Sequence, residues 1–284
     1  MKSSAPTSPL APLWEPPALA GVVLLPRGDG RRWPGRQARP ASLERRYTSA
    51  LLSRQAAVHN VLTEALDDAL KRMPGLNERA RGDSIDGDLR RLLRVVDTVR
   101  IAVGKREKPS TATIEGVAAG VDAAAGAALT KQVQSVYGIR VVSKAATEEL
   151  IGAWVSENVS LIKSIDARYF DEIEAAVVDA VKSGKSTRDL VKLIESRYGV
   201  ARSRAQLIAV DQLGTINAKI TQAKQVSIGI KGYKWSDSND SRVRPLHVLL
   251  NGERFTWAEG HPTEGHPGEP IRCRCVAIPD FDAT

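Results

Sequence analysis

The sequence predicts a mainly α-helical protein with a small β-rich α+β module at its C-terminal end and an extended Pro/Arg-rich arm at its N-terminal end. Three observations support this fold class. Apolar residues recur at helical spacing between residues 42 and 227, aromatic and β-prone residues gather after residue 228, and eight of the fifteen prolines lie in the first 40 residues. We therefore divide the chain into an arm (1–41), a helical hairpin with a small-residue helix (42–140), further helices (141–227) and the β-rich module (228–284).

The arm is basic as well as rich in proline, which disfavours helix. The net charge of the whole chain is +8, and residues 1–110 carry all of this excess, with 20 Lys and Arg against 12 Asp and Glu. Such a block favours a polyanionic partner, of which DNA is the commonest, although it can also be a solvated segment with no dedicated partner. The arginines that we expect to contact DNA or a protein partner are Arg27, Arg31, Arg32, Arg36, Arg39, Arg45 and Arg46.

Several classes of protein are not expected. No run approaches about 18 uninterrupted apolar residues, so we expect no membrane-spanning helix and no membrane partner. The apolar run at 18–25 is short and lacks a small-residue cleavage site, which argues against a secretory signal. The two cysteines, Cys273 and Cys275, lie too close in sequence to staple a disulfide scaffold.

The first helices follow from the heptad-like spacing of their apolar residues. Residues 42–73 form an amphipathic helix that Pro74-Gly75 ends, and residues 84–103 form a second helix that pairs with it as a hairpin. Residues 110–136 form a helix of small residues. Gly116 and Gly120 share one of its faces, which indicates close packing against another helix rather than dimerisation in a membrane.

Four shorter helices are expected next. They cover residues 144–167, 168–183, 187–199 and 203–227. Gly184 ends the second of them and Ser186 caps the third.

The C-terminal module is expected to consist of short strands. Tyr233 and Trp235 share one face of a strand, and Asn251-Gly252 predicts a hairpin between residues 248–250 and 254–256. Residues 271–275 also read as a strand, with Ile271 and the two cysteines on one face and two arginines on the other.

Three of the four histidines and both cysteines lie in this module. Because Cys and His are the usual zinc ligands, His247, His266, Cys273 and Cys275 form a candidate zinc site. The Cys-x-Cys spacing argues against it, since structural zinc sites usually contain Cys-x2-Cys. The cysteines can instead pack as small apolar side chains. We expect no other cofactor.

A catalytic role is a second possibility for the same module. Asp237, Asp240, His247 and Asn251 suggest a metal-dependent nuclease in which His247 is the general base. No second acidic pair with ligand spacing and no nucleophile or phosphate-loop motif is present. We therefore expect no enzyme activity. A free DNA-binding regulator is also disfavoured, because no helix-turn-helix pattern is evident.

The order of motifs in the C-terminal half resembles a known family. The chain contains Asp240-Ser-Arg-Val-Arg-Pro-Leu-His247, then Leu250-Asn-Gly-Glu-Arg-Phe255, and it closes on Arg272-Cys-Arg-Cys275. Over roughly residues 145–278 this is similar to the phage Mu F-like minor head proteins, also called head morphogenesis proteins of tailed phages. The residues that match the family motif are Asp240, Arg242, Arg244, His247, Gly252, Phe255, Cys273, Arg274 and Cys275.

The resemblance implies a structural minor capsid protein of a tailed phage or phage-like particle. Such a protein would be assembled in the host cytoplasm and lie in the capsid interior at the portal vertex. Its implied partners are the portal protein, the major capsid protein or other head proteins, and packaged double-stranded DNA. Its implied role is in head assembly, DNA packaging or genome ejection. The alternative is a metal-dependent DNA-processing enzyme that uses the His/Cys cluster.

The resemblance also suggests structural roles for the motif residues. Asp240 with Arg242 and Arg244 would brace a turn, and His247 would hydrogen-bond within the module. Arg272 and Arg274 would face outward, toward a partner or DNA.

Overall fold

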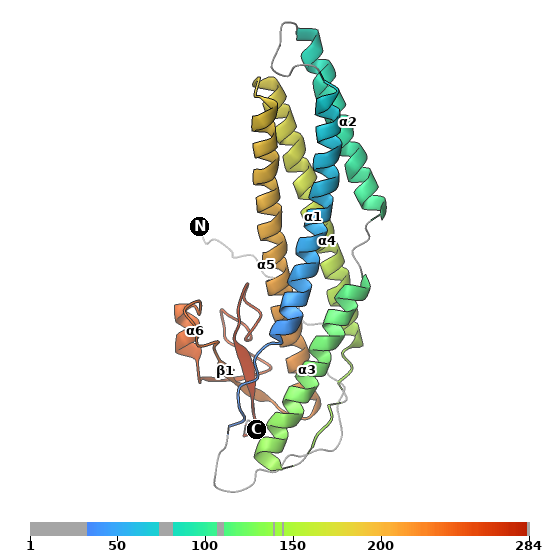
Figure 1. Ribbon diagram of the computed structural model, residues 1–284. Helices are drawn as coiled ribbons and strands as arrows, with labels where there is room; N and C mark the ends of the chain where they lie inside the picture. The colour runs from blue at the N-terminus through green and yellow to red at the C-terminus, as the bar shows by residue number, and fades with distance from the viewer. Residues whose placement is uncertain (1–32, 74–81, 107–110, 139, 144, 283–284) are drawn as a thin grey trace, which may run out of the picture.

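The computed structural model describes residues 33–73, 82–106, 111–138, 140–143 and 145–282. Long helices lie side by side in an elongated bundle, and a small module with short strands packs at one end of it (Figure 1). The helices of the bundle are α1 (Ala41–Lys71), α2 (Gly82–Arg106), α3 (Thr111–Tyr137), α4 (Glu148–Lys182) and α5 (Thr187–Ser227). The mainly helical fold with a small C-terminal sheet is therefore confirmed.

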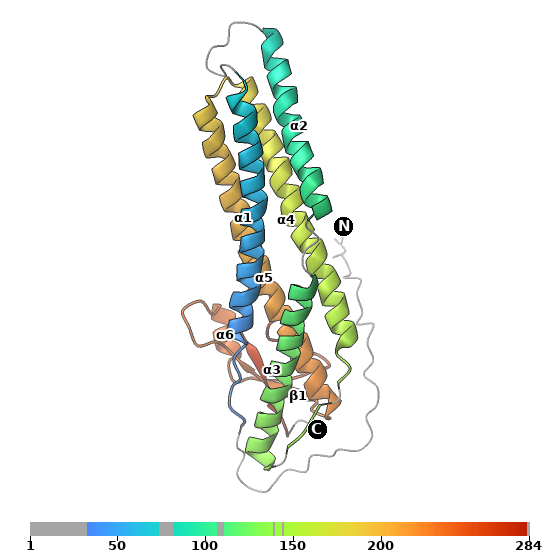
Figure 2. The same ribbon diagram turned by 45° about the vertical axis from the view of Figure 1, so that its right-hand side comes forward.

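Helix α1 runs away from the module and α2 returns toward it, so the two form the expected hairpin (Figure 2). Both pack against α4, and α1 also packs against α5. The apolar faces of all five helices contribute to one core, in which Leu62, Leu92, Val117, Ile173 and Ile216 are completely or almost completely buried. The predicted division between residues 140 and 141 thus falls between helices that share a hydrophobic core.

Two pairs of expected helices are each a single helix. Residues 148–182 form one helix of 35 residues, because neither Gly nor Pro interrupts the apolar face that continues from Ile165 to Ile173. Residues 187–227 form one helix of 41 residues that passes through Gly199. A glycine inside a helix costs only about 1 kcal/mol relative to alanine. The buried face beyond it, which includes Ala201 and Ala205, offsets this cost.

The small-residue helix α3 packs closely on α1, as its glycines predicted. A Cβ atom at Gly120 would lie 2.9 Å from Leu43 Cδ1, so a larger residue there would collide with α1. By length and composition, α3 is also apolar enough to cross a membrane, which the count of uninterrupted apolar residues did not indicate. In this structure it packs against α1, α4 and α5, and 28% of its most apolar window is buried.

The C-terminal module is built on a three-stranded antiparallel sheet. Its strands are β1 (Gly232–Ser236), β2 (Arg254–Thr256) and β3 (Val276–Asp280), in the order β2-β1-β3. Strand β1 lies in the centre, with Tyr233 opposite Phe255 on one side and Pro279 on the other. As expected, Tyr233 and Trp235 lie in one strand, and both are completely buried.

The expected hairpin around Asn251-Gly252 is wrong. Residues 245–250 form the short helix α6 (Pro245–Leu250), because Pro245 occupies the first helical turn, where its missing N–H costs no hydrogen bond. Gly252 still makes the turn into β2, with a φ of +95° that favours glycine. The expected strand at residues 271–275 is also wrong, because residues 271 and 272 lie in a turn and residues 273–275 have no regular secondary structure. Only residues from Val276 onward are in β3, and Ile271 is 63% exposed.

Candidate metal centre

Three of the four predicted zinc ligands come together inside the C-terminal module. His247 lies on α6, and Cys273 and Cys275 lie in the segment without regular secondary structure that leads into β3. His247 Nδ1 is 3.5 Å from Cys273 Sγ and 3.3 Å from Cys275 Sγ. The three side chains are 2%, 5% and 3% exposed, respectively, so the cluster is shielded from solvent. Both thiols therefore point at His247, whereas the Arg274 side chain between them pairs with Asp240.

His266 does not join this cluster, which corrects the four-ligand prediction. Its Nδ1 atom is hydrogen-bonded to the Tyr233 hydroxyl at 2.9 Å, and its ring packs against Tyr233 and Trp257. Burial lowers the pKa of His266. The residue is therefore part of the aromatic core of the module. Sequence alone could not separate it from His247, since both lie within the same Cys/His-rich segment.

A carboxylate that sequence reasoning missed holds the histidine ring. His247 Nε2 is 2.8 Å from Glu264 Oε2, which also lies 3.7 Å from Arg244 Nη1. The Arg244 guanidinium in turn donates to the Ile271 carbonyl at 2.7 Å. The hydrogen bond from His247, together with Arg244, lowers the pKa of Glu264, so this side chain is a carboxylate at neutral pH. Ring orientation by a carboxylate is the common arrangement around metal-binding histidines.

The two thiol groups interact with each other. The thiol of Cys275 donates to the Cys273 sulfur, which lowers the pKa of Cys273 and raises that of Cys275. The backbone N–H of Gly268 also donates to Cys273 Sγ at 3.4 Å. Gly268 has a φ of +96°, and a Cβ atom there would lie 2.9 Å from Ala218 on α5, so the backbone approaches the sulfur in a way that only glycine permits.

The family-motif residues form one connected network around this cluster. Asp240 accepts hydrogen bonds from the Arg242 backbone N–H at 2.9 Å and from the Arg274 guanidinium. It thereby braces the turn before α6, as the resemblance implied. Arg274 does not face outward as expected, because its guanidinium is paired with Asp240. Arg272 is exposed, and its backbone N–H donates to Asp211 Oδ1 on α5 at 2.8 Å.

The remaining motif residues shape the sheet side of the module. Gly252 makes the turn before β2, and the Phe255 ring packs 5.9 Å from both Tyr233 and Trp235, measured between ring centroids. None of these contacts presents a reactive group.

The nuclease arrangement is not supported by the geometry. Both nitrogens of His247 contact partners within the module, so this ring has no free nitrogen to act as a general base. Asp237 Oδ1 accepts the Asn239 backbone N–H at 2.9 Å, and Asn251 Oδ1 accepts the Asp237 backbone N–H at 3.2 Å. These side chains close turns and do not converge on an open site.

The described part of the arm docks on the module. We call residues 33–40 the strap. The Trp33 ring lies 4.7 Å from Arg254 Cζ and 5.0 Å from Lys234 Nζ, an arrangement typical of cation–π contacts. Arg36 Nη2 donates to the Arg274 carbonyl at 3.5 Å.

The prediction that Arg39 contacts DNA is wrong, because this side chain is enclosed within the protein. Its side chain is 7% exposed and lies 3.9 Å from Glu44, and burial lowers its pKa. A Cβ atom at Gly214 would collide with its guanidinium, so α5 leaves room for this side chain only because residue 214 is glycine. A guanidinium enclosed in this way cannot reach a phosphate.

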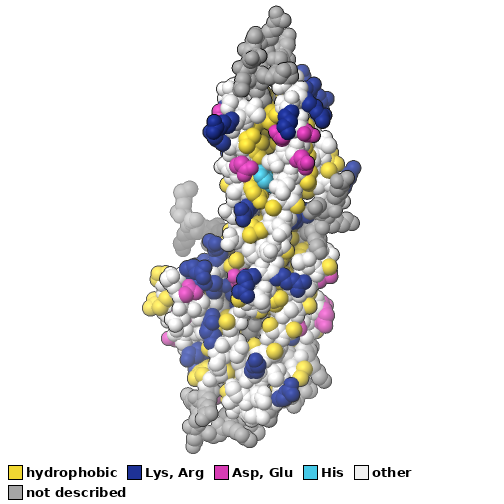
Figure 3. Space-filling view, viewed as in Figure 1, with side chains coloured by type: hydrophobic (Ala, Val, Ile, Leu, Met, Phe, Trp, Pro, Cys, Tyr) yellow, Lys and Arg dark blue, Asp and Glu magenta, His cyan; other side chains and the backbone are white. Residues whose placement is uncertain are grey.

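The other predicted arginines have different positions. Arg45 and Arg46 are exposed at the start of α1, whereas Arg27, Arg31 and Arg32 lie outside the described residues. Lys and Arg side chains gather on the face where the bundle meets the module (Figure 3).

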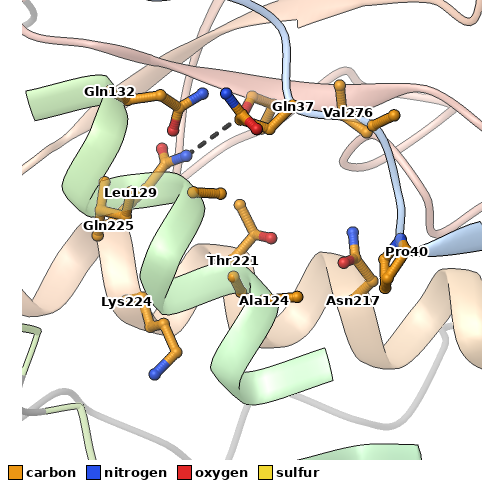
Figure 4. Close-up of a pocket in the computed structure, with 14 residues that line it drawn as sticks. Gln37, Pro40, Ala124, Leu129, Gln132, Asn217, Thr221, Lys224, Gln225 and Val276 are labelled. Carbon is orange, nitrogen blue, oxygen red and sulfur yellow. Dashed lines mark hydrogen bonds between the residues drawn. The ribbon is translucent and has the colours of Figure 1, made fainter. Parts of the chain in front are cut away.

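A cavity of about 50 Å³ lies where the strap, α3, α5 and β3 meet (Figure 4). Gln225 Nε2 donates to the Ala277 carbonyl at 3.2 Å, and Gln132 Nε2 donates to the Gly35 carbonyl at 3.2 Å. Lys224 on α5 pairs with Asp122 on α3 at 3.0 Å. Sites for small molecules are usually several hundred Å³, so this cavity is a packing junction that joins the four segments.

Fold and cluster together define a class: a long helical bundle that ends in a compact module whose Asp-x-Arg-x-Arg-x-x-His and Cys-Arg-Cys elements form one connected network around a buried His/Cys cluster. Residues 171–278, which include the end of α4, all of α5 and most of the module, match the family model of the phage Mu protein F like proteins. This match supports the family prediction over residues 171–278.

The chain is also similar to a bacterial protein. It is 40% identical over 134 residues to an uncharacterized protein of Haemophilus influenzae, a match that covers 47% of this chain and 30% of the relative. The chain thus spans less than a third of the length of that relative. No solved structure matches significantly.

Proposed function

We propose that the protein is a structural head morphogenesis protein, that is, a minor capsid component of a tailed phage or phage-like particle. The observation that carries the proposal is the phage Mu F-like match over residues 171–278. The motif residues support a structural role, because the described ones serve to brace turns, orient His247 or fill the core of the module.

The proposal includes a position at the portal vertex in the capsid interior, with head proteins and packaged DNA as partners. The charge distribution supports contact with DNA, since residues 1–110 carry the whole net charge of +8. Of the predicted set, Arg36, Arg45 and Arg46 are exposed among the described residues, and of these three Arg36 donates to the module, at the Arg274 carbonyl, whereas Arg45 and Arg46 lie at the start of α1. They are the described residues that we assign to the DNA contact.

Quantitative mass spectrometry of gradient-purified particles from the source tests the assignment. We expect peptides of this chain in mature particles at a few to a few tens of copies, far fewer than the major capsid protein. Presence in the producing cell but absence from mature particles would overturn a minor capsid role and leave a scaffold or an enzyme.

DNA contact is tested separately. The double variant Arg45→Ser/Arg46→Ser should bind duplex DNA more weakly, and the slope of log affinity against log salt should fall by about one for each phosphate that the variant no longer neutralises. The variant Arg90→Ser/Arg91→Ser removes the same charge from exposed positions on α2 and serves as the matched control. Equal effects of the two pairs would show a non-specific dependence on charge and refute the assignment to Arg45 and Arg46.

A further inference from the structure

We propose that His247, Cys273 and Cys275 bind one Zn²⁺ ion, which acts as a structural clip within the C-terminal module. The inference rests on the donor atoms alone and does not depend on the proposed role in a phage head. The three donor atoms lie within 4.8 Å of one another, and all three residues are buried.

The spacing of the donor atoms fits zinc. Zn–S and Zn–N bonds of about 2.3 and 2.0 Å at tetrahedral angles place a sulfur and a nitrogen ligand about 3.5 Å apart. The two observed Nδ1–Sγ distances are 3.5 and 3.3 Å. The Cys-x-Cys spacing, which argued against a site from sequence, is accommodated because the segment directs both thiols toward His247 Nδ1.

The chemistry of the donor set selects the metal. Two thiolates and one imidazole favour zinc over magnesium or calcium, which prefer oxygen ligands. Both cysteines are reduced, so both sulfurs can serve as ligands.

The surroundings of the cluster are those of a metal ligand set. When His247 Nε2–H donates to Glu264, Nδ1 carries the lone pair, and it points at the two sulfurs. The Gly268 N–H donates to Cys273 Sγ, and the buried Arg39 guanidinium interacts electrostatically with both sulfurs. Among the residues that the structure describes, no further His, Cys, Asp or Glu donor joins the group.

The position of the cluster explains what zinc would do. It joins α6 to the segment that leads into β3, between positions that are 26 and 28 apart in the sequence. The buried apolar core of this part of the module contains few side chains, and its strands have only five, three and five residues. Small folds with such cores are commonly stabilised by a metal.

The test is metal analysis of the full chain, purified without chelators and loaded with zinc, by native mass spectrometry. We expect one Zn²⁺ per chain in the wild type and loss of this ion in Cys273→Ser and in His247→Ala. The variant His266→Gln is the matched control, since it removes a nearby histidine outside the cluster, and it should keep one ion. The variant Glu264→Gln keeps all three ligands and should weaken zinc affinity by about 10- to 100-fold.

Cobalt substitution gives a second readout that does not depend on comparing variants that may unfold. A thiolate-to-cobalt charge-transfer band in the wild type is expected. A folded wild-type chain that binds no zinc or cobalt, or whose intact mass shows a Cys273–Cys275 disulfide under reducing conditions, would overturn the proposal.

Discussion

The hydrogen bond between Tyr47 and Asn158 provides a direct test of how α1 is joined to α4. Tyr47 on α1 is completely buried, and its hydroxyl donates to Asn158 Oδ1 on α4 at 2.5 Å. Burial raises the pKa of Tyr47 well above its ordinary value, so the hydroxyl remains protonated and remains a donor. The Asn158 amide group is already engaged, donating to the Trp154 carbonyl and to Gln212 Oε1.

The substitution Tyr47→Phe keeps the ring and removes only the hydroxyl. It leaves the oxygen of a completely buried Asn158 without this donor, so we expect the free energy of unfolding to fall by about 1–3 kcal/mol. For a chain of roughly this size, each kcal/mol corresponds to a decrease of about 2–4 °C in Tm. Reversible urea unfolding followed by circular dichroism measures the change.

Tyr198→Phe is the matched control. The Tyr198 ring stacks on His59 with centroids 3.9 Å apart, and its hydroxyl makes no hydrogen bond within the described residues. Removing that hydroxyl should change the free energy of unfolding by less than about 0.5 kcal/mol. If Tyr47→Phe were no more destabilising than Tyr198→Phe, the assigned packing of α1 against α4 would be wrong.

Two further predictions test the core and the strap. Leu62→Ala on α1 should lower the free energy of unfolding by about 2–5 kcal/mol, because Leu62 is completely buried. Val61→Ala changes a position that is 49% exposed and should alter the free energy of unfolding by less than about 0.5 kcal/mol. Similar values for the two variants in urea unfolding would contradict the assignment of Leu62 to the buried face of α1. Trp33→Ala should lower it by about 1–2 kcal/mol, because the cation–π contacts with Lys234 and Arg254 disappear, and should increase hydrogen exchange in the strap. Unchanged exchange there would show that Trp33 does not hold the strap.

The positions of the helices could be predicted where apolar residues recur at helical spacing. The residues at which the helices end were harder to predict. The apolar face of α5 continues past Gly199 because the helix packs along its length against α1, α3 and α4. A local rule that glycine ends a helix cannot include those neighbours. In the same way, Asn251-Gly252 has the composition of a hairpin turn, but Pro245 starts a helix before it, and the turn joins a helix to a strand.

The sequence predicted which types of residue form the candidate site, but not which individual residues belong to it. Residue type and proximity in sequence nominated His247, His266 and the two cysteines equally, whereas only the fold separates His266 from the cluster. Glu264 carried no motif signal, since a lone glutamate between glycine- and proline-rich turns is typical of surface loops. Its role follows from the placement of α6, which brings His247 Nε2 within 2.8 Å of it.

The strap changes how the basic N-terminal segment should be interpreted. A block of arginines predicts a polyanionic partner, yet Arg39 is enclosed against α5 and the Cys-Arg-Cys segment, and Arg36 donates to the carbonyl of Arg274. Part of the positive charge of the arm therefore stabilises the protein itself, because Arg39 interacts electrostatically with the two sulfurs and Arg36 holds the strap on the module. A partner that binds the residues preceding the strap would consequently disturb the contacts between the strap and the proposed zinc site. Zinc removal and deletion of residues 1–40 should then each increase hydrogen exchange in the module. If both changes disrupt the same contacts, making them together should increase hydrogen exchange no more than the stronger of the two does alone.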